Sequence, residues 1–189
     1  SFVNGIIYED IAIYQMLKNT NINLIWNQAH FAVNYHSINY WLSKDNIISC
    51  MLANELEKSE LKTVLDNVNK KVILPILGLN MAMYSRRTLL KFYSDTFKTE
   101  YTNVAVLKND AVEFLAKENE YGTVLFYNKY FNLIPELEHI NDDKILMYYI
   151  DPNRLTSKDV IAILNGKKID YDNKFYENKT VYKVSDLKW

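Results

Sequence analysis

The first half of the chain alternates short, continuous apolar runs with segments whose apolar residues recur at helical spacing. The runs cover residues 5–9, 22–26, 47–52 and 72–77. Consecutive apolar residues, rather than alternating ones, are typical of strands buried on both faces of a sheet. A strand followed by a helix, repeated along the chain, is the pattern of parallel βα units. We therefore predict an α/β fold for residues 1–97.

Four βα units make up half of an eight-stranded (β/α) barrel, which typically takes about 250 residues. The chain has 189 residues and does not begin with Met, so we expect a partial TIM-type barrel whose opening strands lie outside this sequence. A small open α/β sheet is the alternative, and chain length slightly favours it.

Two serines precede helical segments and are predicted N-caps. Ser59 comes before a segment with apolar residues at i, i+3, i+4 and i+7, and Ser85 comes before one that carries Leu89, Phe92 and Phe97 on its apolar side. The fourth strand is expected to end just before Gly78.

The second half of the chain has a different pattern, with several short apolar segments separated by turns. This pattern predicts a small α+β extension, residues 98–189, packed on the βα units. Short strands are expected over 104–107, 113–116, 123–127 and 144–150. Thr156 is followed three residues later by Asp159, a weaker form of the capping box. Gly166 suits the C′ position that ends this helix.

Composition excludes several classes of protein. With 49% hydrophobic residues the chain is not intrinsically disordered, and no apolar run is long enough to span a bilayer. A net charge of -1 does not indicate a nucleic-acid-binding protein, although it does not exclude a local basic face. No secretory signal is visible, and Cys50, a lone cysteine in an apolar run, is expected to be buried and inert. We therefore expect a cytoplasmic protein.

Polar residues follow the predicted strands at the ends where βα proteins bind their ligands. Glu9, Gln28, Glu55 and Asn80 stand at or just after the four ends, and parallel strands would bring them to one mouth. Glu9 and Glu55 could share general acid and base chemistry there. The open alternative is that polar residues collect at strand ends because these ends meet water.

The segment from Gly78 to Arg87 is the most unusual in the chain. A helix beginning near Ser85 would offer free N–H groups, and Arg86 and Arg87 beside them would complete an anion site. An ordinary cap with surface arginines is the alternative. Two arginines at a helix start oppose the helix dipole, a cost that an anion or a buried acid would offset.

Several of these residues carry a resemblance to the collagenase-like peptidase family, U32, whose catalytic type is unknown. They are Asn34, the stretch Asn54-Glu55-Leu56 with Glu60 downstream, Gly78, and Tyr84-Ser85-Arg86-Arg87-Thr88-Leu89-Leu90. The stretch Glu118-Asn119-Glu120-Tyr121-Gly122-Thr123 is similar to an acidic-then-Gly-Thr segment of the same family. The resemblance covers roughly Gly5 to Tyr127.

The resemblance implies a (β/α) barrel-type catalytic domain. Some members are described as collagenases, and others act in oxygen-independent hydroxylation of the tRNA wobble uridine, of ribosomal RNA, or in ubiquinone synthesis. Several of the latter hold an iron–sulfur cluster through cysteines around the Tyr-Ser segment, where this chain has Met81 and Thr88. We expect no cluster and name no cofactor, since neither side chain replaces a thiolate. The chain resembles the short, cluster-free type of low-GC Gram-positive bacteria.

The first functional hypothesis is a peptidase acting on a peptide or protein substrate. The candidate catalytic residues are Glu55, Tyr84, Ser85 and Arg87, and the candidate substrate-binding residues are Glu9, Gln28, Asn34, Asn54, Gly78, Asn80 and Arg86. The alternatives are a tRNA-modification protein that assists wobble-uridine hydroxylation, and a non-catalytic partner of a larger homologous subunit. No membrane partner is expected.

Overall fold

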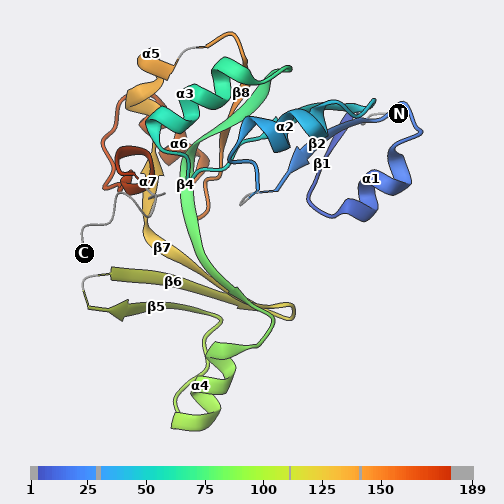
Figure 1. Ribbon diagram of the computed structural model, residues 1–189. Helices are drawn as coiled ribbons and strands as arrows, with labels where there is room; N and C mark the ends of the chain where they lie inside the picture. The colour runs from blue at the N-terminus through green and yellow to red at the C-terminus, as the bar shows by residue number, and fades with distance from the viewer. Residues whose placement is uncertain (1–3, 29–30, 111, 141, 180–189) are drawn as a thin grey trace, which may run out of the picture. The chain divides into compact units, whose positions relative to one another are not determined.

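The computed structural model describes residues 4–28, 31–110, 112–140 and 142–179 (Figure 1). The chain forms two compact units. The half-barrel unit comprises residues 1–76, 133–150 and 173–189, and the hairpin unit comprises residues 77–132 and 151–172. The chain passes from the first to the second within one strand, β4. The division after residue 97 stays a prediction.

Parallel strands build the half-barrel unit, as predicted. Strands β1 (Gly5–Tyr8), β2 (Asn23–Asn27) and β3 (Ile47–Met51) pair in parallel in chain order. Strand β4 (Val72–Ser85) continues the series in parallel with β3, and β8 (Ile145–Ile150) also pairs with β4. The α/β class is therefore confirmed, and the βα units form a curled half-barrel sheet.

Helices connect these strands. They are α1 (Ile11–Leu17), α2 (Tyr35–Leu42) and α3 (Lys58–Asn67), and the later short helices of the unit are η1 (Ile134–Glu136), α5 (Leu137–Ile140) and α7 (Lys174–Glu177). The predicted N-cap of α3, Ser59, is wrong. Glu57 occupies that position, because it and Glu60 form a reciprocal capping box.

The expectation that the apolar strands are buried on both faces is confirmed only in part. Leu24 on β2 and Ile47 and Cys50 on β3 are fully shielded from solvent, whereas Ile7 on β1 and Ile48 on β3 are 50% and 40% exposed. Burial raises the pKa of the Cys50 thiol, because a thiolate loses its hydration there. Cys50 is therefore buried, as expected.

Strand β4 does not end before Gly78, so that prediction is wrong. The strand continues to Ser85, because β7 (Gly122–Asn132) pairs with it in antiparallel fashion from Leu77 onward. Gly78 is needed for close packing rather than as a stop. A Cβ at this position would lie 3.0 Å from Cε1 of Phe131 and 3.3 Å from Cβ of Asp151.

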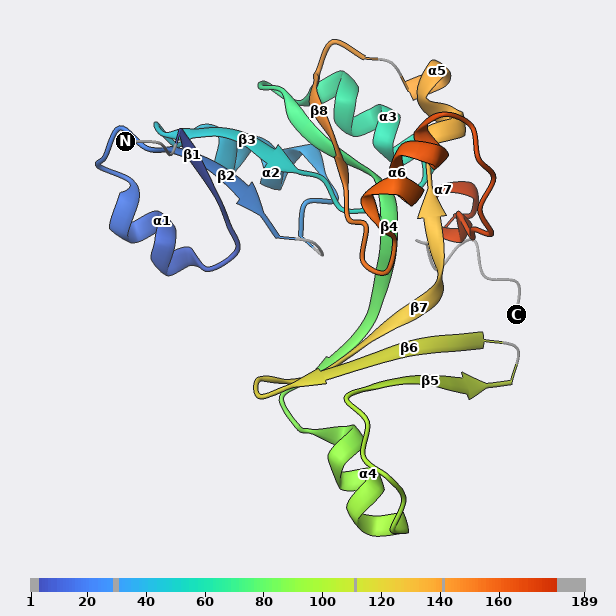
Figure 2. The ribbon, with the colours of Figure 1, turned by 180° about the vertical axis from the view of Figure 1, so that it is seen from behind.

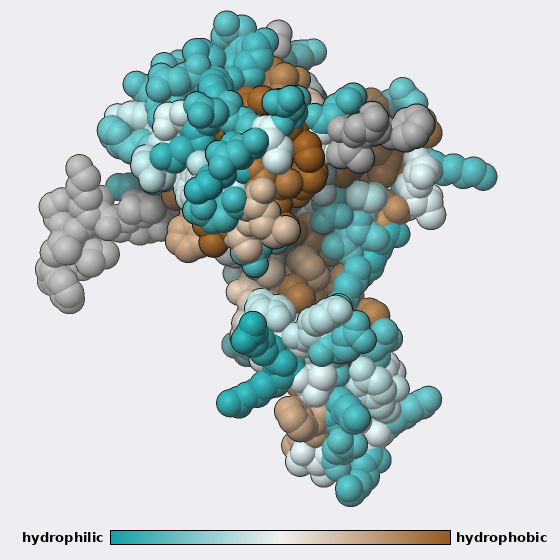
Figure 3. Space-filling model, turned by 90° about the vertical axis from the view of Figure 1, so that its right-hand side faces the viewer, coloured by the Kyte–Doolittle hydropathy of each residue, from teal (hydrophilic) through white to brown (hydrophobic). Residues whose placement is uncertain are grey.

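The hairpin unit is an antiparallel sheet with a helix on one face. Its strand order is β4-β7-β6-β5, with β5 at Val104–Asn109 and β6 at Val112–Asn119. Helix α4 (Leu89–Phe97) lies beside the β5–β6 hairpin in both ribbon views (Figures 1 and 2). At the level of α4, at the bottom of Figure 3, apolar side chains reach the surface among hydrophilic ones.

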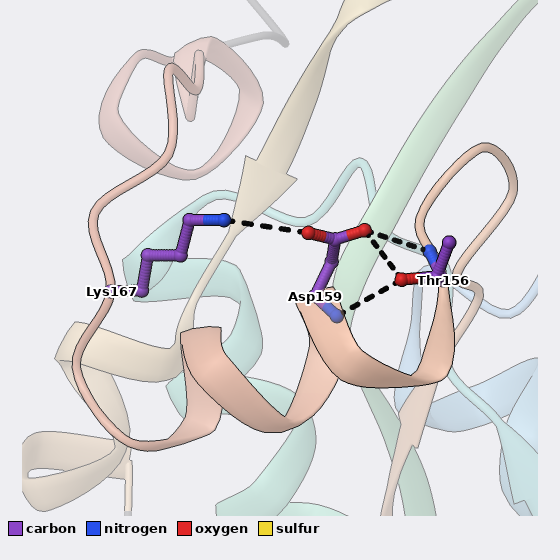
Figure 4. A network of polar contacts seen from close by, with 3 residues as sticks. All are labelled: Thr156, Asp159 and Lys167. Carbon is purple, nitrogen blue, oxygen red and sulfur yellow. Dashed lines mark hydrogen bonds and ion pairs between the residues drawn. The ribbon is translucent and has the colours of Figure 1, made fainter.

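Helix α6 (Ser157–Leu164) has the ends that the sequence predicts. Thr156 and Asp159 form the capping box, and Lys167 adds an ion pair of 3.4 Å with Asp159 (Figure 4). Hydrogen bonds from Thr156, followed by that from Lys167, hold the pKa of Asp159 below its ordinary value. At the other end the N–H groups of Gly166 and Lys167 donate to Ile163 and Ala162, which is a Schellman motif.

Candidate functional site

The ends of β1 and β2 open into a cavity of about 580 Å³ in the half-barrel unit. Glu9 and Gln28, which follow these two strands directly, line the cavity together with Asn34 at the start of α2. Three of the predicted substrate-binding side chains therefore gather at one site. Parallel pairing is the cause, because it brings successive carboxyl ends to the same edge of the sheet.

Polar contacts fix the rim of this cavity. The amide of Asn27 donates to Oε1 of Glu9 at 3.0 Å, and the amide of Gln28 donates to the backbone oxygen of Glu9. Oδ1 of Asn34 accepts from the N–H of Ser37 at 3.0 Å and so caps α2. Asn34 thus serves the fold while its side chain borders the cavity.

Aromatic rings that the sequence reading did not select form the wall of the cavity. Trp26 from β2 stacks on Trp41 from α2 with ring centroids 5.4 Å apart, and Phe31 lies exposed near the opening. Tyr8 from β1 pairs in register with Trp26. The sequence offered a signal for two of these residues, since Tyr8 and Trp26 are aromatic residues at or next to the ends of the first two strands, but such a position is equally typical of core packing.

Tyr8 is nearly fully buried, and within the described residues its hydroxyl has no hydrogen-bond partner. Burial raises the pKa of Tyr8, and the nearby Tyr14 and Cys50 raise it further. A hydroxyl left unpaired in an apolar setting costs free energy, and a polar group of a ligand would offset that cost. Tyr8 is therefore an additional candidate for ligand contact.

Asn54 and Glu55 form a turn after β3 in the half-barrel unit, and both are half-buried. They are not among the residues that line the cavity of Glu9 and Gln28. The structure thus keeps Glu55 in the same unit as Glu9, two strands further along the sheet.

Asn80 lies within β4 in the hairpin unit, at an irregularity in the pairing with β7. It is 4% exposed, and its Oδ1 has no hydrogen-bond partner within the described residues. Because the strand continues through this position, Asn80 is not a strand-end residue as the sequence reading supposed.

The Tyr-Ser-Arg-Arg segment forms the connection between β4 and α4. The hydroxyl of Tyr84 donates to the backbone oxygen of Tyr121 at 3.0 Å, and Oγ of Ser85 accepts from the N–H of Arg87 at 3.1 Å. Ser85 is not the N-cap of the helix, because it pairs with Thr123 as the last residue of β4. Both arginines are exposed.

The free N–H groups predicted here are bound by an acid of the chain itself. Glu118, at 5% exposure, accepts from the N–H of Leu90 at 2.7 Å and of Lys91 at 3.1 Å. Thr123 accepts from the N–H of Leu89 at 2.9 Å and donates to Glu118 at 2.6 Å. The start of α4 is therefore a capped helix end. Of the two groups expected to offset the arginines, a bound anion or a buried acid, the described residues supply the buried acid, Glu118.

These hydrogen bonds set the charge of Glu118. Burial alone would raise its pKa, but hydrogen bonds from Thr123, from the two helix N–H groups and from Tyr101 outweigh burial and keep the pKa below its ordinary value of 4.5. Desolvation raises the pKa of Tyr101, and the contact of its hydroxyl with the Glu118 carboxylate raises it further. Glu118 is thus an ionised structural carboxylate at neutral pH.

A half-barrel of parallel βα units with a cavity at its strand ends defines a mixed α/β protein. The chain matches the model of Peptidase family U32 over residues 2–181, and it therefore belongs to this family. No curated protein and no solved structure matches it.

Three further observations concern cofactors and membranes. Met81 lies on β4 and Thr88 is the N-cap of α4, so neither supplies the thiolates of an iron–sulfur cluster. Among residues 4–28, 31–110, 112–140 and 142–179, no group of three or more His, Cys, Asp or Glu side chains could hold a metal ion. No helix in these ranges is long and apolar enough to cross a membrane.

Proposed function

We propose that the protein hydrolyses peptide bonds at the strand-end cavity of the half-barrel unit. The family is named for peptidases. The observation that carries the proposal is that Glu9, Gln28 and Asn34 line one cavity although they lie on three successive stretches of the chain. A cavity with apolar walls and a few convergent polar groups is typical of a ligand site.

The chemistry assigns a role to each kind of side chain. Glu9 takes a proton from water, the resulting hydroxide adds to the carbonyl carbon, and the C–N bond breaks as the amide nitrogen receives a proton. The amides of Gln28 and Asn34 hold the polar backbone of the substrate. Trp26 and Phe31 accommodate an apolar side chain next to the cleaved bond.

The residues carried over from the family resemblance remain secondary candidates. We propose Glu55 as the second carboxylate of the half-barrel unit, and Arg87 as a group of the hairpin unit that by itself binds a carboxylate or another anion. Tyr84 and Ser85 have hydrogen bonds that stabilise the β4–α4 connection. For these two residues a role in holding the connection is the simpler account.

Cleavage of quenched fluorescent gelatin and casein tests the proposal. The purified chain should release fluorescence with or without added Mg²⁺ or Zn²⁺. Glu9→Gln should lower kcat/KM by about 10²–10⁴ because the general base is lost. Glu138→Gln, an exposed acid on α5, is the matched control and should behave as the unsubstituted protein.

One result would overturn this function, and another would overturn the role given to Glu9. One is the absence of cleavage under every metal condition, which would favour a non-catalytic subunit if the chain co-purifies with a larger relative. The other is full activity of Glu9→Gln, which would move the catalytic role to Glu55.

A second function, tRNA modification, is favoured by one surface of the hairpin unit. Arg86, Arg87 and Lys91 are exposed and lie close in sequence to Phe92 and Tyr93, whose rings are also exposed. Basic groups beside aromatic faces suit nucleic acid, with affinity that falls as salt rises. Mass spectrometry of tRNA from a deletion strain tests it, and an unchanged level of hydroxyuridine would contradict it.

A further inference from the structure

Strand β5 is the edge strand of the hairpin unit. It pairs with β6 in unbroken register from Val104 to Asn109, and within the described residues no strand pairs with its outer edge. The N–H of Glu118 donates to the backbone oxygen of Asn103, so the odd-numbered residues of β5 bond to β6. By the alternation of an antiparallel ladder, the backbone groups of Val104, Val106 and Lys108 point outward.

Natural edge strands usually carry features that prevent further pairing, such as prolines, bulges or several charges. Strand β5 has no proline, no bulge against β6 and a single charged side chain, Lys108. Val106 is 55% exposed and Leu107 is 40% exposed. The backbone oxygen of Val104 accepts from the hydroxyl of Thr102 at 2.7 Å, whereas the outward backbone groups of Val106 and Lys108 are open, within the described residues, to pairing with another strand.

An apolar cavity of about 450 Å³ lies beside this edge, between α4 and the sheet. Ala105, Ala116, Leu125 and Met83 line it and are partners in register across β5, β6, β7 and β4. The two alanines are the members of this row nearest the edge. Their small side chains leave room for a larger apolar side chain brought in by an added strand.

We propose that the added strand is β5 of a second copy of this chain. The two strands run antiparallel about a two-fold axis at Val106, so that Val106 faces Val106 of the partner copy. Leu107 of each copy then lies beside Ala105 of the other and enters its cavity. Lys108 lies beside Val104, so no like charges are opposed.

Only this register gives complementary side chains. If the strands slide by two residues in one direction, Ala105 faces Ala105 of the partner copy and the cavity stays unfilled. If they slide by two residues in the other direction, Leu107 faces Leu107 and the two side chains crowd each other. The same patch serves both copies, as a two-fold interface requires. This interaction is separate from the strand-end cavity and does not depend on peptidase activity.

Disulfide trapping tests the register directly. The Cα atoms of a hydrogen-bonded antiparallel pair lie about 5.5 Å apart, within the usual disulfide range of about 4.4–6.8 Å. Val106→Cys should give a covalent dimer on mild oxidation, and the buried Cys50 should not interfere. Val104→Cys is the matched control and should cross-link several-fold less by itself, yet should cross-link when mixed with Lys108→Cys.

Sedimentation velocity provides the second measurement. A short edge buries less than the roughly 1,200–2,000 Å² of a stable interface, so the dimer should be weak and should grow with concentration. Val106→Pro removes an outward N–H but no bond to β6, and should stay monomeric, whereas Val106→Thr should behave as the unsubstituted chain. Equal cross-linking of Val106→Cys and Val104→Cys, or a monomer at every concentration, would overturn the proposal.

Discussion

Helices α2 and α4 have nearly the same length, eight and nine residues, yet the chain holds them in place in opposite ways. Helix α2 begins at its own cap, Asn34, and buries Ile38 and Leu42. Its cap and its buried side chains belong to the helix itself or to the residue just before it, and Asn39 adds hydrogen bonds with Asn67 and Asn69.

Helix α4 has no such local support. Its N-cap residue, Thr88, makes no side-chain cap, and its only buried residue is Ser94. Its first N–H groups are bound instead by Glu118 and Thr123, which are supplied by the β6–β7 hairpin. Phe97 is 63% exposed.

The difference shows that two helices with similar apolar patterns can be stabilised by different kinds of interaction. Burial of apolar surface stabilises α2, whereas α4 depends on a polar contact made by residues about 30 positions away. Mutations should therefore affect the two helices by different mechanisms and by different amounts.

The largest expected effect is on α2. Ile38→Ala should lower the free energy of unfolding by about 2–5 kcal/mol, because it leaves a cavity at a fully buried site. Urea unfolding followed by tryptophan fluorescence reports on this unit, since it contains Trp26 and Trp41. Tyr40→Ala, at an exposed position of α2, is the control. A loss below about 1 kcal/mol in the Ile38→Ala variant would contradict the role given to burial.

The next effect is on α4. Glu118→Gln should cost about 1–3 kcal/mol, because one acceptor is replaced by a donor facing the N–H groups of Leu90 and Lys91. Hydrogen exchange of these two amides should become faster. The exposed Glu120→Gln is the control, and unchanged protection of the amides in Glu118→Gln would show that α4 has another anchor.

The cap of α4 should also be sensitive to pH. The folded-state pKa of Glu118 lies below its ordinary value of 4.5, so its contribution to stability is present above that value and is lost as pH falls through the folded pKa. The stability gap between the unsubstituted chain and Glu118→Gln should therefore narrow below about pH 4.5. A gap that stays constant down to pH 3, in urea titrations followed by circular dichroism, would be evidence against the ionised cap.

The sequence predicts those parts of the fold that depend on neighbouring residues. The apolar runs located β1, β2 and β3, and the spacing of Thr156, Asp159 and Gly166 located both ends of α6. The extension of β4 to Ser85 could not be predicted in this way. It depends on pairing with β7, which lies about 40 residues further along the chain.

The candidate site divides in the same way. Glu9 and Gln28 were identified because parallel strands bring their carboxyl ends to one edge. Trp41 was missed as a wall of the cavity, because its position depends on how α2 packs on the sheet. Glu118 belonged to a recognised stretch, but nothing in the sequence indicated that it caps a helix distant along the chain.

A smaller effect is expected at the local cap of α2. Asn34→Ala should cost about 1 kcal/mol, because the N–H of Ser37 loses its acceptor. Asn34→Asp keeps the cap and should be close to neutral in stability. The pair also separates the two roles of Asn34, since a loss of peptide cleavage in Asn34→Asp without a loss of stability would indicate contact with substrate.

The smallest effect is expected on the exposed side of α4. Phe97→Ala should change the free energy of unfolding by no more than about 0.5 kcal/mol, because the ring contacts Tyr93 at 4.7 Å between centroids but is mostly solvated. Ile38→Ala should cost several times more although it removes a smaller side chain, because Ile38 is fully buried and Phe97 is not. Unfolding must be followed at a protein concentration low enough to exclude dimers. A loss above about 1 kcal/mol in the monomer would show that this face of α4 is covered, and that the contrast with α2 is smaller than the contacts of the two helices indicate.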